Sequence, residues 1–67
     1  MDIAKKNKEL LDEIQEAKDE WKRALMQFEY AEHPDAIDFS AFYIQAAERR
    51  YMYLLNKYKQ WMSENGL

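Results

Sequence analysis

Two heptad stripes, one on each side of the segment His33-Pro34-Asp35, constrain the fold of this 67-residue chain more than any other feature. The first stripe alternates spacings of four and three residues and contains Leu10, Ile14, Ala17, Trp21, Ala24, Phe28 and Ala31. The second stripe alternates the same spacings and contains Ile37, Ser40, Ile44, Ala47, Tyr51, Leu54 and Tyr58. Stripes of this kind are typical of helices that pack against each other along their length.

The two stripes are complementary in size when the chain folds back at the turn. Five of the seven rungs place a small residue opposite a large one, as side chains need in order to interdigitate. The rungs are Ala31/Ile37, Phe28/Ser40, Ala24/Ile44, Trp21/Ala47, Ala17/Tyr51, Ile14/Leu54 and Leu10/Tyr58. The pattern predicts an all-α fold, a two-helix antiparallel hairpin. The residues expected to carry its seam are Ile14, Trp21, Phe28, Ile44, Tyr51 and Leu54.

The boundaries of the predicted helices follow from the turn residues and the chain ends. We expect a single domain over residues 1–67, with helix one at about 7–31, a turn at 32–35 and helix two at about 35–63. Residues up to about Lys6 are expected to fray, because terminal turns lack hydrogen-bond partners. Pro34 suits the first helical position, and Asp35 is an alternative N-cap. Asn65-Gly66 is a typical helix end.

Helix two carries more apolar surface than one partner helix can cover. A further set of apolar side chains lies beside its seam stripe, and we expect it to form an association face. This set contains Phe39, Phe42, Tyr43, Ala46 and Tyr53. Contiguous apolar patches are unusual on monomers. The sequence therefore predicts that two hairpins form a homodimeric four-helix bundle, or that the hairpin docks on another protein through this face.

Charge and composition favour a protein ligand over nucleic acid or membrane. The net charge is −3, and all of the excess lies in residues 1–34, which hold nine acids and six bases. This balance disfavours nucleic acid and anionic membrane surfaces. No apolar run approaches the length of a membrane span, and the N-terminus lacks the apolar core of a secretory signal. With no cysteine in the chain, we expect a soluble, cytoplasmic protein.

The residues that usually carry chemistry are sparse. His33 is the only histidine, and Ser40 is expected to face Phe28 in the seam, so a nucleophile and base have no orienting third group. Glu29 and His33 do not reproduce the Glu-x-x-His pairs of carboxylate-bridged metal sites in helical bundles. We therefore expect no catalytic residue, no cofactor and no metal site.

Three segments resemble a known family. They are residues 13–21 (EIQEAKDEW), 33–38 (HPDAID) and 46–55 (AAERRYMYLL). These segments are similar to the first helix, the turn and the most recognisable stretch of the YaaL-like proteins, a small Firmicutes family with a domain of unknown function. The resemblance covers about residues 9–60 and implies a small cytoplasmic helical protein of Gram-positive bacteria. It supplies no activity or catalytic residues.

A second resemblance suggests an alternative function. The aspartyl-phosphate phosphatases of sporulation phosphorelays are also two-helix hairpins with a Pro-Asp-like turn and a following serine. That resemblance implies a small regulatory enzyme acting on a phosphorylated response regulator through Asp35, Asp38 or Ser40. The family's second helix carries Ser-x-x-x-Asp, whereas Ser40 is followed four residues later by Ile44. The principal hypothesis is therefore a non-enzymatic interaction protein.

Overall fold

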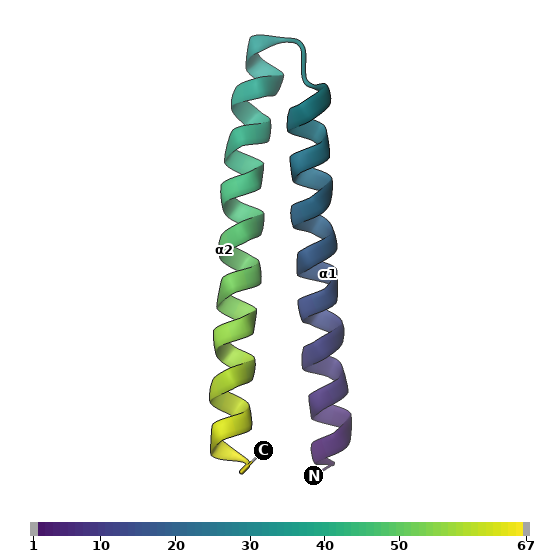
Figure 1. The fold of residues 1–67 in the computed structure, drawn as a ribbon, viewed down its shortest axis with the longest axis vertical. Helices are drawn as coiled ribbons and strands as arrows, with labels where there is room; N and C mark the ends of the chain where they lie inside the picture. The colour runs from purple at the N-terminus through teal and green to yellow at the C-terminus, as the bar shows by residue number, and fades with distance from the viewer. Residues whose placement is uncertain (1, 67) are drawn as a thin grey trace.

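The computed structural model describes residues 2–66 and consists of two long helices joined by a short turn. Helix α1 spans Ile3–Tyr30, and helix α2 spans Pro34–Glu64. The helices run antiparallel and side by side, so the two ends of the chain lie at the same end of the molecule (Figure 1). The predicted all-α hairpin is confirmed, and the described residues contain no strand.

Helix α1 begins four residues earlier than the sequence analysis expected. The Asp2 side chain accepts hydrogen bonds from the backbone N–H of Ala4 at 3.0 Å and of Lys5 at 3.3 Å. These bonds satisfy two of the backbone donors that a helix start leaves unpaired. The expectation that residues up to about Lys6 fray is therefore wrong, because it overlooked Asp2 as an N-cap.

The turn ends α1 and starts α2 within three residues. Ala31 and His33 have extended backbones, and Pro34 occupies the first turn of α2. The Asp35 N–H donates to Nδ1 of His33 at 3.1 Å, which makes His33 the N-cap. Of the two alternatives, Pro34 at the start of the helix is correct, and Asp35 as N-cap is wrong.

The far end of α2 closes as its sequence predicts. Asn65 is the C-cap, and its Nδ2 donates to the Trp61 carbonyl at 2.8 Å. Gly66 has a φ of 71°, a left-handed conformation that glycine adopts without steric cost. The helix consequently ends at Glu64, one residue beyond the expected boundary.

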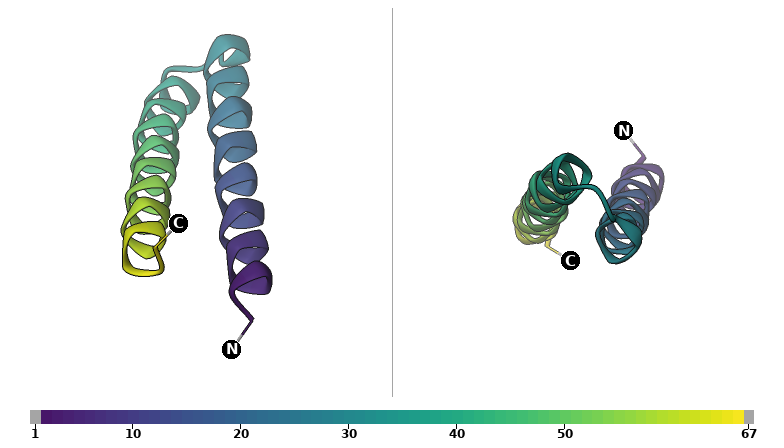
Figure 2. Two further views of the ribbon diagram at one scale, coloured as in Figure 1. Left: turned by 60° about the horizontal axis from the view of Figure 1, so that its bottom comes forward. Right: turned by 90° about the horizontal axis from the view of Figure 1, so that it is seen from above.

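The enclosed core is a single line of residues along the seam. One residue in every seven is at most 7% exposed, and we call these the deep positions. They are Leu10, Ala17 and Ala24 of α1 and Ser40, Ala47 and Leu54 of α2. Most of these side chains are small, which allows the two helices to pack closely. The helices lie side by side in each of the two further views (Figure 2). The molecule measures 49 × 16 × 14 Å, so little of it is far from solvent.

Candidate functional site

The large side chains of the seam lie beside the deep positions and are only partly covered. We call these the rim positions; they are Ile14, Trp21 and Phe28 of α1 and Ile37, Ile44, Tyr51 and Tyr58 of α2. Phe28 is 44% exposed, and most of the others are half-buried. Five of the six expected seam residues occupy rim positions, whereas Leu54 alone is deep. In the middle of the seam the two helices enclose the small side chains between them, so the large ones protrude to one side. Near the open end, Leu10 and Leu54 are themselves enclosed.

Trp21 and Tyr51 show that the rim positions of both helices lie on the same side of the seam. Their ring centroids are 5.7 Å apart, with an angle of 36° between the ring planes. This distance is typical of a favourable aromatic contact. The indole Nε1 of Trp21 is buried without a hydrogen-bond partner, which costs about 1–3 kcal/mol.

The opposite side of the seam, next to the deep positions, is polar. Glu20 lies three residues after Ala17, and Arg50 lies three residues after Ala47. Their side chains form an ion pair at 3.4 Å between the Arg50 guanidinium and Glu20 Oε1. This contact joins the two helices on that side of the seam. It also shows that charged side chains border the deep positions on this side.

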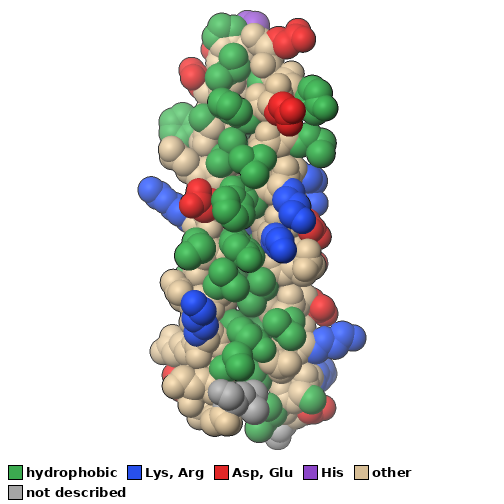
Figure 3. Space-filling model, viewed as in Figure 1, with side chains coloured by type: hydrophobic (Ala, Val, Ile, Leu, Met, Phe, Trp, Pro, Cys, Tyr) green, Lys and Arg blue, Asp and Glu red, His purple; other side chains and the backbone are tan. Residues whose placement is uncertain are grey.

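The rim side of the seam is bordered by apolar residues instead. Helical neighbours are three or four residues apart, so Leu25 lies beside Trp21, and Leu55 lies beside Tyr51. Leu25 is 47% exposed. An apolar stripe accordingly runs the length of the molecule over the seam (Figure 3). We call it the seam face and define it by Leu11, Trp21, Leu25, Ile44, Tyr51 and Leu55.

The seam face is not evident from the heptad stripes, because the stripes give both sides of the seam the same status. Neither Leu11 nor Leu25 belongs to a stripe or to the expected association face. The signal was present in the sequence as Leu25 and Leu55, which lie four positions after Trp21 and Tyr51. On the other side of the seam, Glu13, Glu20 and Arg50 lie three positions after the deep residues Leu10, Ala17 and Ala47.

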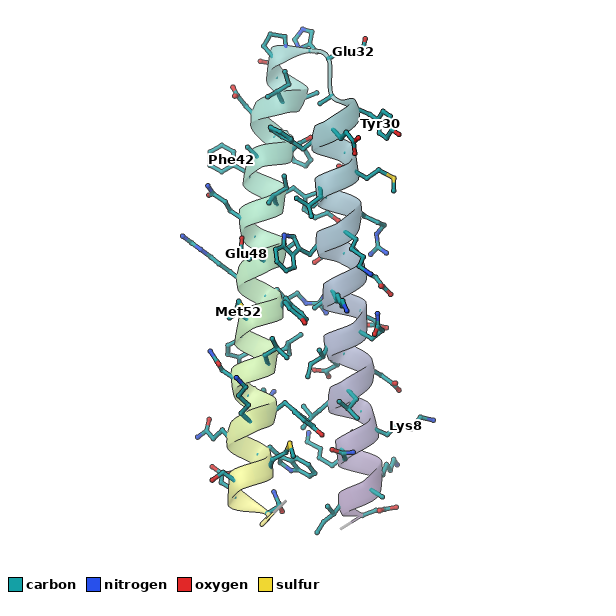
Figure 4. The ribbon with its side chains drawn as sticks, in the orientation of Figure 1. Lys8, Tyr30, Glu32, Phe42, Glu48 and Met52 are labelled. Carbon is teal, nitrogen blue, oxygen red and sulfur yellow. The ribbon has the colours of Figure 1, made fainter. Side chains whose placement is uncertain are left out.

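The residues expected to form an association face lie on the outer side of α2. Phe39, Phe42 and Tyr53 are 66%, 72% and 63% exposed, and Ala46 is also exposed. Tyr43 is half-buried, and its ring lies 6.3 Å from that of Phe39. Phe42 points away from α1 (Figure 4). The structure therefore brings these side chains together at the surface but not into the seam face.

Two shallow hollows lie along this outer side of α2. One is lined by Asp38, Ala41, Phe42 and Gln45. The other is lined by Gln45, Glu48, Arg49, Met52, Tyr53 and Asn56. Both are bounded by residues of α2 alone, so they are surface depressions beside aromatic side chains rather than a cleft between the helices.

The residues considered for chemistry do not converge. Ser40 is at a deep position within the seam, whereas Asp35 and Asp38 are exposed near the start of α2. The Asp35 carboxylate lies 3.9 Å from Nδ1 of His33, and both side chains are largely solvent-exposed. Within residues 2–66, no three His, Cys, Asp or Glu side chains form a cluster that could hold a metal ion.

Comparison with known proteins gives the chain a family. Residues 2–61 match the model of a family described as "Protein of unknown function (DUF2508)". The match covers most of the chain and includes all of α1 and α2 as far as residue 61. The chain belongs to this DUF2508 family. The expected membership of a family of unknown function is thereby confirmed at that level.

The DUF2508 assignment brings no activity, ligand or partner with it. No curated protein matches the chain. No solved structure matches it either. Over the part of the chain that the structure describes, neither helix combines the length and apolar character required to cross a membrane. The function of this DUF2508 chain therefore has to be argued from its own surfaces.

Proposed function

We propose that this chain is a non-enzymatic interaction protein that binds another protein, or a second copy of itself, through a helical surface. The observation that carries the proposal is the exposure of Phe39, Phe42 and Tyr53 on the outer side of α2. Each aromatic side chain that remains in water forfeits about 1.5–3 kcal/mol that burial would supply. A partner surface that covers them recovers this free energy.

The composition of the outer side of α2 supports a protein ligand. Tyrosine and arginine are enriched among the residues that dominate binding at protein interfaces. Tyr53, Arg49 and Met52 line one shallow hollow, and Phe42 lines the next. A partner helix or loop that inserts apolar side chains into these hollows would bury the aromatic rings. The proposal assigns no role to nucleic acid or to a membrane.

The proposal also places the chain within the YaaL-like group. That resemblance rests on residues 13–21, 33–38 and 46–55, which belong to the two helices and the turn. With it comes a cytoplasmic location in Gram-positive bacteria. Fractionation of cells that express the tagged chain checks the location, and recovery in the membrane fraction would contradict it.

Site-specific photo-crosslinking in living cells tests the proposed binding surface. A photoreactive amino acid replaces Phe42 or Tyr53 in the full chain, and Asp12 on the exposed side of α1 serves as the matched control. We expect discrete crosslinked products from Phe42 and Tyr53 but not from Asp12. The mass of each product identifies a second copy or another protein. Equal yields at all three positions, or no product at any of them, would refute the proposal.

A further inference from the structure

The chain as a whole exposes more surface than a compact protein of its mass. The chain exposes 5311 Å², whereas a compact monomer of 8.2 kDa exposes about 4,500 Å². The excess is about 800 Å², which is the area that each partner contributes to a protein interface of standard size. Leu11, Leu25 and Phe28 are among the exposed apolar residues of this face or its rim.

The corners of the seam face carry opposite charges at its two ends. The residue directly after a rim position is Glu29 on α1 and Asp38 on α2 near the turn. Near the open end, Lys59 follows the rim residue Tyr58, and Lys8 follows Asn7, which lies seven residues before the rim residue Ile14. All four side chains are exposed, and none takes part in an ion pair within residues 2–66.

This polarity extends beyond the four corners. Residues 24–47 around the turn contain four acids and no lysine or arginine. On the face that carries the apolar stripe, the charged side chains near the turn are acidic, whereas both basic and acidic ones occur further down (Figure 3). Lys8 lies near the open end, and Glu32 lies at the turn (Figure 4). The face is therefore complementary to a copy of itself that has been turned end over end.

We propose that the occupant of the seam face is a second copy of this chain, packed face to face with its turn at the opposite end. The inference goes beyond the proposed function, because it concerns the seam face and not the outer side of α2. The two-fold axis lies across the middle of the helices, so Lys8 faces the partner's Glu29 and Lys59 faces the partner's Asp38. The product is an antiparallel four-helix bundle.

The alternative dimer, with both turns at one end, has unfavourable corners. It places Lys8 opposite the partner's Lys59 and Glu29 opposite the partner's Asp38. At the centre of the face, Lys18 and Glu48 occupy equivalent positions on the two helices. In the reversed dimer each of them faces its own copy, whereas the alternative dimer pairs Lys18 with the partner's Glu48. The four corner pairs outnumber these two central pairs and therefore decide the orientation, since like charges in proximity are destabilising.

Solution mass and a distance measurement test the inference directly. Sedimentation equilibrium of the purified full chain is expected to give twice the monomer mass of 8.2 kDa. The chain has no cysteine, so a spin label at Glu32→Cys is unique. In the reversed dimer, the helical rise separates the two labels by about 40 Å along the axis. Labels within about 20 Å of each other would indicate that the turns are together, and would overturn the proposal.

A charge-reversal series tests the corners by a second measurement. Glu29→Lys combined with Asp38→Lys is expected to raise the dimer Kd by roughly tenfold at low salt, and by less at high salt. Adding Lys8→Glu and Lys59→Glu restores the opposite charges and the affinity. The matched control, Asp12→Lys with Glu16→Lys, makes the same change of net charge outside the seam face and leaves the Kd unchanged. Circular dichroism checks that each variant retains its helices.

Each remaining outcome has one interpretation. A mass of 8.2 kDa at every concentration would overturn the second copy as the occupant, and the crosslinking experiment at Phe42 and Tyr53 would still decide the proposed function. A dimer whose Kd ignores the corner reversal, or responds equally to the control, would overturn the reversed arrangement. Loss of the dimer in Leu25→Glu but not in Phe42→Glu supports the seam face over the outer side of α2.

Discussion

The hydroxyl of Tyr58 donates a hydrogen bond of 2.6 Å to Oδ1 of Asn7, which joins residues 51 positions apart in the sequence. Tyr58 is at a rim position near the end of α2, and Asn7 lies about one turn into α1. Both side chains are half-buried. The bond therefore fastens the open end of the hairpin, where no connecting loop holds the helices together.

Removal of this bond is expected to destabilise the open end. Tyr58→Phe keeps the ring and removes only the donor, so the free energy of unfolding should fall by about 1 kcal/mol. Tyr30→Phe is the matched control, because Tyr30 points into solvent (Figure 4) and is expected to leave stability unchanged. Urea denaturation at a fixed protein concentration measures both variants.

A double-mutant cycle isolates the contribution of the pair. Asn7→Ala, Tyr58→Phe and the double variant should give a coupling energy of about 0.5–1.5 kcal/mol. Additive effects would show that the two side chains contribute independently and that the hydrogen bond does not fasten the end.

Trp21 is expected to stabilise the middle of the hairpin less than its size suggests. A fully enclosed tryptophan costs about 3–5 kcal/mol on replacement by alanine. Trp21 is half-buried and its Nε1 has no partner, so we expect Trp21→Ala to cost about 2–3 kcal/mol. Thermal unfolding followed by circular dichroism measures the loss. An unchanged melting temperature would show that the Trp21/Ala47 rung does not form.

Trp21→Phe separates ring packing from the unpaired indole. Phenylalanine retains an aromatic ring beside Tyr51 and introduces no donor that lacks an acceptor. The two effects oppose each other, so the free energy of unfolding should remain within about 1 kcal/mol of the original value. A loss as large as that of Trp21→Ala would indicate that the indole N–H finds an acceptor in solution.

The heptad stripes and Pro34 were sufficient to predict the hairpin. The spacings from Leu10 to Ala31 and from Ile37 to Tyr58 specify two packed helices, and Pro34 specifies where they separate. The start of α1 was missed because a single Asp2 decides it. Capping at a chain terminus depends on one side chain and leaves no periodic signal.

The distribution of burial across the seam was harder to predict than the seam itself. A heptad pattern gives Trp21 and Ala17 the same status, yet the small residue is fully enclosed and the large one protrudes. That difference depends on how closely the backbones approach. The exposure of Leu25 likewise depends on which side of the seam carries charged pairs such as Glu20 and Arg50. These relationships require the register of both helices in space.

Ala47 and Ala46 offer a matched test of the close approach between the helices. Ala47 is 1% exposed at a deep position, whereas the adjacent Ala46 is exposed. Ala47→Leu is expected to force the helices apart and lower the free energy of unfolding by about 1–3 kcal/mol. Ala46→Leu adds the same atoms to the surface and should change stability by less than about 0.5 kcal/mol. Equal effects of the two substitutions would contradict the observed register.

The N-cap of α2 can be improved without disturbing the turn. Pro34 restricts His33 to an extended backbone, the conformation that an N-cap residue requires. The imidazole accepts one bond, from the Asp35 N–H, and serine or asparagine is a stronger cap in the same geometry. His33→Ser should therefore raise the free energy of unfolding by about 0.5–1 kcal/mol, and His33→Ala should lower it by a similar amount. Chemical denaturation distinguishes the two directions. A stabilising His33→Ala would mean that the bond to Asp35 does not support the start of the helix.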